Sequence, residues 1–175
     1  MIKMYLDLDG VICDFIKHYH MIEPSVDSPK KFHKMVMEYQ ILEKLDWMPN
    51  GKKLIALLDE LQYPVEILSS LGTHTELVAT QAQRQKTHWL SAHNIQYKTN
   101  FVNTWAHKYR YATKYSLMID DRGDVCEDFI RASGAAVTYV DHKFDDMAAQ
   151  IKTELQKLEN LSKQKDLNAS LYVPK

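Results

Sequence analysis

The chain has 175 residues, which is within the usual size of a single domain and long enough to bury a substantial apolar core. Hydrophobic residues make up 45% of it and charged residues 26%, a balance typical of globular proteins and not of disordered or fibrous ones. The 22 basic and 23 acidic side chains nearly cancel. The sequence therefore offers no broad positive field that would hold an extended nucleic acid or an anionic membrane.

The cysteines and the hydropathy pattern bear on where the chain acts. Cys13 and Cys126 have neither the spacing of a metal site nor the density of a disulfide framework, as expected for thiols in a reducing compartment. Acidic residues lie within the first ten positions, and no apolar run approaches the roughly 20 residues of a membrane span. We expect a cytoplasmic protein without a membrane partner, and the sequence leaves its oligomeric state open.

Apolar runs alternate with helical periodicity along the chain. The strands that we expect cover residues 2–8, 64–70, 100–104, 116–120 and 135–140. The expected helices cover residues 51–62, a stretch from a capping box at Thr73 and Glu76 through Trp89, residues 124–132 and residues 144–163. This alternation predicts a doubly wound, Rossmann-like α/β fold, with a five-stranded parallel sheet and helices on both faces.

The stretch between the first two strands is longer than one crossover helix requires. Residues 15–46 within it have a helical character, and we interpret them as a small helical cap inserted over the carboxyl ends of the strands. The α/β core then comprises residues 1–14 and 47–165. Residues 166–175 are expected to form a flexible polar tail.

Two aspartates follow the first strand at a spacing of two. Asp7 and Asp9 would leave the same face of the chain, and Gly10 permits a tight backbone turn directly after them. A pair of carboxylates is costly unless a cation or a shared proton relieves the repulsion. An isolated pair of this kind would be explained more simply as a solvated strand end.

Further polar residues lie next to other predicted strands in the sequence. They are Ser69 and Ser70 after the second strand, Asp120 and Asp121 after the fourth, and Lys108 and Lys114 before the fourth. Each alone could be a helix cap or a surface charge. Because the carboxyl ends of parallel strands meet at one edge of a sheet, we expect the acids, a hydroxyl group and an amine to gather there.

In this order, the residues resemble the four motifs of the haloacid dehalogenase superfamily. The segments are Asp7-Leu8-Asp9-Gly10-Val11, Ile67-Leu68-Ser69-Ser70, a lysine, and Leu117-Met118-Ile119-Asp120-Asp121. Asp14 and Phe15 after the first motif, Arg122 after the last, and Leu45-Asp46-Trp47-Met48-Pro49 are similar to the 5'(3')-deoxyribonucleotidase branch. Ser69-Ser70-Leu71-Gly72 departs from that branch, where mammalian nucleotidases have Thr-Ser-Pro.

The resemblance implies a phosphomonoester hydrolase that depends on Mg²⁺ and passes through an aspartyl-phosphate. Its substrate would be a small phosphorylated molecule, most simply a nucleoside or deoxynucleoside monophosphate, as for a 5'-nucleotidase. The Asp7 carboxylate, the Asp9 backbone carbonyl and Asp120 would hold Mg²⁺. Asp7 would be the nucleophile, and Asp9 would protonate the leaving group and then activate water.

The resemblance also implies which residues bind the substrate. Ser69, Ser70 and a lysine would hold the phosphoryl group, and Lys108 is preferred over Lys114, because Lys114 lies so near the fourth strand that its side chain could point away. Phe15 and Trp47 are candidates to stack on a base, although most aromatic side chains pack in the core. Asp121 and Arg122 are expected to support Asp120 and its loop rather than to touch the substrate.

Three alternatives remain open at this stage. A polynucleotide 3'-phosphatase would need a basic groove, which the balanced charge does not suggest. The same machinery would serve other small phosphorylated metabolites. A receiver-like signalling module also gathers acids, a hydroxyl group and a lysine at strand ends, but its phosphorylated aspartate ends a middle strand and it does not need an acid at the position of Asp9.

Overall fold

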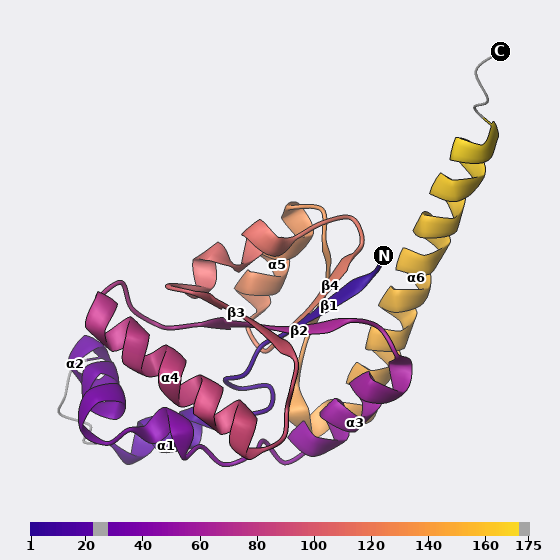
Figure 1. Ribbon diagram of the computed structural model, residues 1–175. Helices are drawn as coiled ribbons and strands as arrows, with labels where there is room; N and C mark the ends of the chain where they lie inside the picture. The colour runs from indigo at the N-terminus through magenta and orange to yellow at the C-terminus, as the bar shows by residue number, and fades with distance from the viewer. Residues whose placement is uncertain (23–27, 172–175) are drawn as a thin grey trace.

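The computed structural model describes residues 1–22 and 28–171. Five strands form one parallel sheet in the order β3-β2-β1-β4-β5 (Figure 1). They are β1 (Lys3–Leu6), β2 (Val65–Ser70), β3 (Lys98–Val102), β4 (Ser116–Asp120) and β5 (Ala135–Thr138). The predicted α/β fold with a five-stranded parallel sheet is confirmed.

The register of the three central strands brings their carboxyl ends to one level. Leu6 of β1 pairs with Ile67 of β2 and with Ile119 of β4, and the side chains of all three are fully buried. The backbone N–H of Asp7 donates to the carbonyl of Ile119 (3.0 Å), so Asp7 stands level with Asp120. Near-continuous apolar runs of this kind are what a sheet covered on both faces requires.

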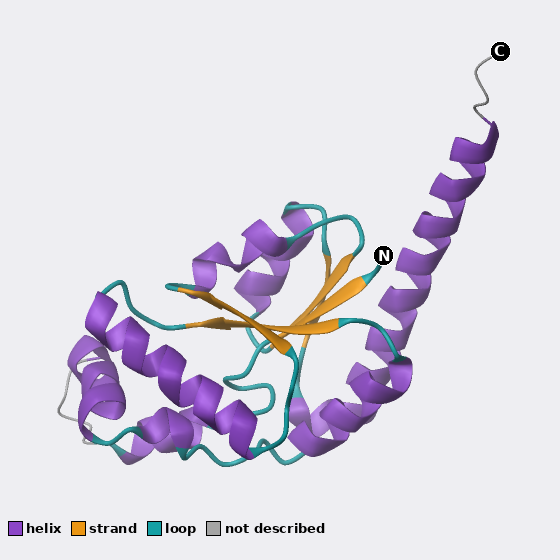
Figure 2. Cartoon of the chain, in the orientation of Figure 1, coloured by secondary structure: helices purple, strands orange, loops and turns teal. Residues whose placement is uncertain are grey.

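Helices cover both faces of the sheet (Figure 2). On one face, α5 (Gly123–Arg131) and the 3₁₀ helix η3 (Trp105–Tyr111) pack over a small cluster around Tyr5, Met118 and Phe129. The other face carries the larger core, to which α3 (Gly51–Leu61), α4 (Glu76–Ala92) and α6 (Phe144–Leu171) contribute. A short 3₁₀ helix, η4 (Asp141–Lys143), precedes α6.

Several element boundaries differ from the sequence predictions by a few residues, and three of the differences change the interpretation. Strand β3 begins at Lys98, two residues before the predicted range. The predicted capping box is wrong, because α4 begins at Glu76; the Thr73 hydroxyl instead accepts a hydrogen bond from the N–H of Thr75 (3.0 Å) in a turn before the helix. Helix α6 continues to Leu171, beyond the position at which the tail was expected to begin. Residues 172–175 of the expected tail lie outside the described residues.

The segment that we expect to be the cap consists of short helices beside α4 (Figure 1). They are α1 (Phe15–Met21), α2 (Ser28–His33), a π-helix, η1 (Lys34–Glu38), and a 3₁₀ helix, η2 (Ile41–Glu43). Residues 23–27, between α1 and α2, lie outside the described residues.

Two side chains of α4 hold this segment in place. The Gln85 amide donates to the carbonyl of Val36 (2.7 Å) and accepts from the N–H of Leu42 (3.2 Å). The indole of Trp89 donates to the carbonyl of Leu45 (2.8 Å). Val36, Leu42 and Leu45 are buried in the larger core, so the segment packs firmly onto α4.

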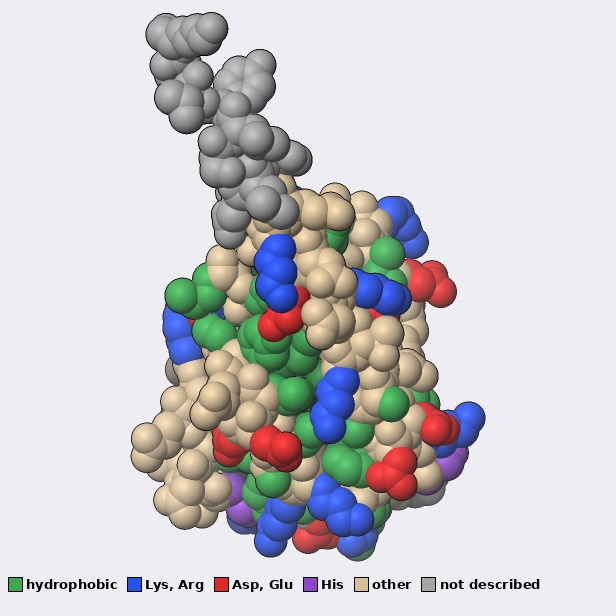
Figure 3. Space-filling view, turned by 90° about the vertical axis from the view of Figure 1, so that its right-hand side faces the viewer, with side chains coloured by type: hydrophobic (Ala, Val, Ile, Leu, Met, Phe, Trp, Pro, Cys, Tyr) green, Lys and Arg blue, Asp and Glu red, His purple; other side chains and the backbone are tan. Residues whose placement is uncertain are grey.

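Charged side chains of both signs are interspersed on the face seen in Figure 3, where α3 and α6 lie. Lysine and arginine side chains alternate there with acidic and apolar ones and do not gather into one patch. Within residues 1–22 and 28–171, no helix combines the length and the apolar character that crossing a membrane requires.

Candidate active site

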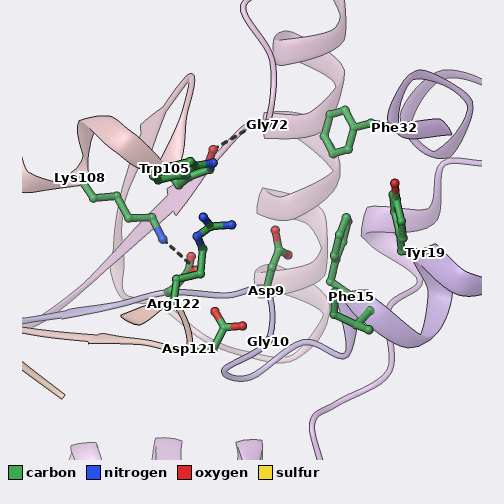
Figure 4. Close-up of a pocket in the computed structure, with 13 residues that line it drawn as sticks. Asp9, Gly10, Phe15, Tyr19, Phe32, Gly72, Trp105, Lys108, Asp121 and Arg122 are labelled. Carbon is green, nitrogen blue, oxygen red and sulfur yellow. Dashed lines mark hydrogen bonds and ion pairs between the residues drawn. The ribbon is translucent and has the colours of Figure 1, made fainter. Parts of the chain in front are cut away.

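A cavity of about 540 Å³ opens at the carboxyl edge of the sheet. The loops after β1, β2 and β4 line it together with α1, α2 and η3; the residues are Asp7, Asp9, Gly10, Phe15, Ile16, Tyr19, Phe32, Ser70, Gly72, Trp105, Lys108, Asp121 and Arg122. Figure 4 shows Phe15, Tyr19 and Phe32 on one side of it and Trp105 and Arg122 on the other, with Asp9 between them. The cavity thus has a polar floor and a largely aromatic wall.

Three carboxylates form the acidic part of this floor. One oxygen from each of Asp7, Asp120 and Asp121 lies within 4.8 Å of the others. Asp7 and Asp120 are buried, and Oδ1 of Asp7 has no hydrogen-bond partner within the part of the chain that the structure describes. Carboxylate oxygens at this separation are a donor set that a hard divalent cation such as Mg²⁺ prefers, so these residues fit the ion.

Lys108 of η3 binds two of these acids. Its Nζ atom lies 2.8 Å from Oδ2 of Asp7 and 2.7 Å from Oδ2 of Asp120, and the residue is 1% exposed. Burial alone would lower the pKa of Lys108, but Asp7 and Asp120 together hold it above its ordinary value. Lys114 lies instead over the ring of Tyr115, 5.2 Å from its centroid, and does not line the cavity.

Burial and the nearness of other acids raise the pKa values of Asp120 and Asp121. Burial, followed by the charge of Asp7, raises the pKa of Asp120 to about 6. The Asp121 carboxyl is enclosed by the cavity although the residue as a whole is exposed, and this enclosure, followed by the charges of Asp7 and Asp120, raises its pKa to about 7. A divalent cation would reverse both effects, because it favours the charged forms.

Gly10 makes room for Asp121. Its φ is +79°, a conformation that side chains disfavour, and a Cβ atom there would lie 2.6 Å from Cγ of Asp121. The third carboxylate can therefore lie against the turn after β1 only because position 10 is a glycine. This is the turn that the sequence predicted after the two aspartates.

The side chain of Asp9 faces a second buried lysine, Lys86 of α4, which sequence reasoning missed. The Nζ atom of Lys86 donates to Oδ2 of Asp9 (2.6 Å), to Oγ of Ser69 (3.0 Å) and to the carbonyl of Ser70 (2.8 Å). Lys86 is 2% exposed. Burial raises the pKa of Asp9 and the charge of Lys86 opposes the rise.

A signal for Lys86 was present in the sequence. Val78, Ala82 and Leu90 recur at intervals that place them on one buried row of α4, and Lys86 occupies the remaining position of that row. A lysine in the middle of an apolar row is seldom buried without a partner. Its partner could not be read from the sequence, because Asp9 is 77 positions away.

Only one of the two serines faces the cavity. Ser70 lines it, and its hydroxyl accepts a hydrogen bond from the N–H of Gly72 (3.0 Å). Ser69, which was expected to bind the phosphoryl group, is fully buried against Lys86 on the α4 side. Successive residues of a strand point to opposite faces, so the two adjacent hydroxyls cannot both serve the site in this arrangement.

The structure places the two aromatic candidates, Phe15 and Trp47, in different surroundings. Phe15, the first residue of α1, lines the cavity. Trp47 does not: its ring packs against those of Trp89 (4.9 Å between centroids) and His93 (5.1 Å). The structure thus gives Trp47 a packing role beneath the cap segment and leaves the cavity wall to Phe15, Tyr19 and Phe32.

Arg122 both supports Asp120, as expected, and lines the cavity. Its backbone N–H donates to Oδ1 of Asp120 (3.0 Å). Its guanidinium lies 4.1 Å from the centroid of the Trp105 ring and is held by both carboxylate oxygens of Asp124. The guanidinium of Arg122 is thereby fixed beside Trp105, on the wall opposite Phe15, Tyr19 and Phe32.

No family model and no curated protein matches the chain. Among solved structures, it is similar to a D,D-heptose 1,7-bisphosphate phosphatase from Burkholderia thailandensis, with a TM-score of 0.46 and 12% identity over 77% of this chain and 75% of that chain. It is also similar to a hydrolase from Streptococcus pneumoniae TIGR4, with a TM-score of 0.44 and 12% identity over 79% of this chain and 92% of that chain. Similarities of this extent do not establish a family.

Proposed function

We propose that the chain is a Mg²⁺-dependent phosphomonoester hydrolase of the haloacid dehalogenase superfamily, with Asp7 as its nucleophile. The observation that carries this proposal is the state of the Asp7 carboxylate in the cavity floor. Lys108 holds its Oδ2 atom, whereas Oδ1 is buried and without a hydrogen-bond partner. A buried acid with one oxygen fixed and one free is suited to bind a cation or to attack an electrophile.

The metal would be held by Asp7 and Asp120, with the Asp9 backbone carbonyl as a further ligand. The position of Asp121 adds a third carboxylate at suitable range. When bound, Mg²⁺ would neutralise the charge of both the acids and the phosphate ester, which otherwise repel each other. The raised pKa values of Asp120 and Asp121 support this proposal, because they reflect burial and then the repulsion of neighbouring acids, and a bound cation would offset both by favouring the charged carboxylates.

The chain's own residues would then divide one displacement into two. An Asp7 oxygen bonds to phosphorus, and the bond to the leaving oxygen breaks, which gives an aspartyl-phosphate. Asp9 protonates the leaving oxygen and later takes a proton from the water that cleaves the intermediate. Ser70, in the place first expected for Ser69, would donate to a phosphoryl oxygen, and Lys108 would balance its charge.

The finer proposal is that the substrate is a nucleoside or deoxynucleoside monophosphate. Phe15, Tyr19 and Phe32 offer aromatic surface on one wall, and an aromatic face over a nucleobase is worth about 1–3 kcal/mol. A cavity of about 540 Å³ is of the size that takes a ligand of this kind. The buried free thiols of Cys13 and Cys126 support the proposal that it acts in the reducing cytoplasm.

The test is a phosphate-release screen over nucleotides and other phosphorylated metabolites, with Mg²⁺ or with EDTA. We expect turnover only with Mg²⁺, and we expect Asp7→Asn to lower it by at least about 10³-fold. Asp128→Asn is the matched control, because Asp128 is an acid on α5 whose partner is Arg131 and which does not line the cavity. After acid quenching, mass spectrometry should find one phosphoryl group on the peptide that contains Asp7. Equal turnover in Asp7→Asn and the control would reject the proposal.

A further inference from the structure

We propose that Lys86 is a positioning residue for Asp9: it fixes one oxygen of that carboxylate so that the other, Oδ1, exchanges the proton with the leaving group. This inference rests on the proposed function and assigns a role to a residue that the four motifs do not include.

Lys86 cannot itself bind the substrate. It is 2% exposed and is not among the residues that line the cavity. An ammonium group has three N–H donors, and those of Lys86 are taken by Asp9, by the Ser69 hydroxyl and by the Ser70 carbonyl. Any effect of Lys86 on the reaction must therefore act through these three groups.

The two oxygens of Asp9 are in different states. Oδ2 accepts from Lys86 at 2.6 Å, whereas Oδ1 is buried and has no hydrogen-bond partner among the described residues. In the first half of the reaction, phosphorus bonds to an Asp7 oxygen and its bond to the ester oxygen breaks; the electron pair stays on that oxygen, which takes a proton from Oδ1. In the second half, Oδ1 takes a proton from the water, whose oxygen bonds to phosphorus as the bond from phosphorus to Asp7 breaks and the Asp7 carboxylate is restored. The hydrogen bond from Lys86 decides which oxygen does this.

Helix α4 holds Lys86 rigidly. The residue before it, Gln85, is fully buried and bonds the carbonyl of Val36 and the N–H of Leu42. Trp89, one turn further on, bonds the carbonyl of Leu45. A group placed by a packed helix keeps its geometry better than one on a loop. Lys86 also donates a hydrogen bond to the carbonyl of Ser70, so it fixes the position of the end of β2 as well as that of Asp9.

Lys86 and Lys108 serve different acids from different sides of the sheet. Lys108 comes from η3 and binds Asp7 and Asp120, whereas Lys86 comes from α4 and binds Asp9. Loss of Lys86 should thus impair the proton transfer and leave the nucleophile in place. The loss of rate should then depend on the leaving group, because only esters with poor leaving groups need a proton from the enzyme.

The experiment measures kcat and KM of Lys86→Met with Mg²⁺ over a series of phosphate esters whose leaving groups range from 4-nitrophenol to simple alcohols. We expect kcat on alkyl phosphates to fall by about 100-fold or more and kcat on 4-nitrophenyl phosphate to fall by less than about 3-fold, with little change in KM. Arg84→Met is the matched control, because it removes a cation of the same helix whose partners are Gln81 and Glu43 and which does not line the cavity. It should leave the dependence on the leaving group unchanged.

A second comparison covers the case in which Lys86→Met does not fold because it leaves the Asp9 charge buried without a partner. Asp9→Asn combined with Lys86→Met removes both charges. If Lys86 acts through Asp9, the double variant and Asp9→Asn alone should show the same dependence on the leaving group. A further loss on alkyl phosphates in the double variant would overturn the inference.

The outcomes separate the inference from the function on which it rests. Absence of phosphate release from every ester by the unaltered protein with Mg²⁺ would reject the hydrolase itself. Release by the unaltered protein, with a loss in Lys86→Met that is uniform across the series, would reject the positioning role and leave the hydrolase standing. A loss that grows as the leaving group becomes poorer supports the positioning role.

Discussion

The Cβ atom of any side chain at Gly10 would come within 2.6 Å of Cγ of Asp121. The turn after β1 and the loop after β4 thus share one small space, and the absence of a side chain at position 10 lets the Asp121 carboxylate fill it. Gly10, in the first motif, thereby determines where Asp121, in the last motif, can lie.

Gly10→Ala should therefore lower stability and weaken the acidic site together. Strain at a positive φ and the collision with Asp121 should cost about 1–3 kcal/mol in the free energy of unfolding, as measured by urea denaturation. Gly123→Ala is the control, because a Cβ atom there meets nothing within 4 Å, and it should change stability by less than about 0.5 kcal/mol. Equal effects of the two substitutions would show that Asp121 does not depend on the glycine.

Mg²⁺ should stabilise the protein more at high pH than at low pH. The folded pKa values of Asp120 (about 6) and Asp121 (about 7) lie above the ordinary value of 3.8. Without metal, the folded state therefore holds protons that the unfolded chain releases above about pH 4, and this contribution to stability is lost as the pH rises towards 7. Metal and protons compete for the same oxygens.

Thermal unfolding with and without Mg²⁺ at about pH 5.5 and about pH 8 measures this competition. We expect the rise in Tm on adding Mg²⁺ to be larger at the higher pH. Asp121→Asn should reduce the difference between the two pH values, because it removes the group that titrates highest. A rise in Tm that is independent of pH would contradict a site made of these carboxylates.

Lys108→Met should be strongly destabilising and Lys114→Met nearly neutral. Removal of Lys108 leaves Asp7 and Asp120 buried without their shared partner, a loss of about 3–5 kcal/mol in the free energy of unfolding. Lys114 gains only a contact with the Tyr115 ring, worth about 0.5 kcal/mol. Denaturant midpoints of the two variants give the comparison, and comparable losses would mean that Lys108 does not have this role.

Phe15→Ala should change substrate preference, whereas Trp47→Ala should change stability. Phe15 lines the cavity, so its loss should change the ranking of substrates more than the rate on a minimal aryl phosphate. Trp47 packs on Trp89 and His93, so its loss should lower stability by about 3 kcal/mol and leave the ranking unchanged. Activity over a substrate panel and a urea titration on each variant test both statements. A changed ranking in Trp47→Ala would place that residue at the substrate after all.

Much of the fold could be predicted because local patterns determine it. The apolar runs around Leu6, Ile67 and Ile119 predicted central strands, and parallel pairing then brought Asp7 and Asp120 to one edge without further information. The start of α4 was missed because Thr73 offered the same capping signal as a true N-cap, and only the competing turn with Thr75 shows which was formed.

The site was harder to predict, because its geometry depends on which way neighbouring side chains point. Ser69 and Ser70 are adjacent residues of the same type, so the sequence alone does not distinguish them. A shift of the strand register by one residue would exchange the hydroxyl that reaches the cavity for the one that faces Lys86. Trp47 and Phe15 are likewise both aromatic candidates in the sequence, and only the packing of Trp47 on Trp89 and His93 shows that it does not line the cavity. The apolar row of α4 marked Lys86, but its partner could not be predicted, because Asp9 lies far along the chain and no periodicity links a helix position to a strand end.

The balance of charge in the cavity floor implies an order of events. Asp7, Asp120 and Asp121 lie beside one buried ammonium group, that of Lys108, so above about pH 7 and without the ion this part of the floor carries an excess of negative charge. A phosphate dianion that approached first would be repelled, whereas one that followed the divalent ion would be attracted. We therefore expect compulsory ordered addition, metal before ester, and release of inorganic phosphate before the metal departs.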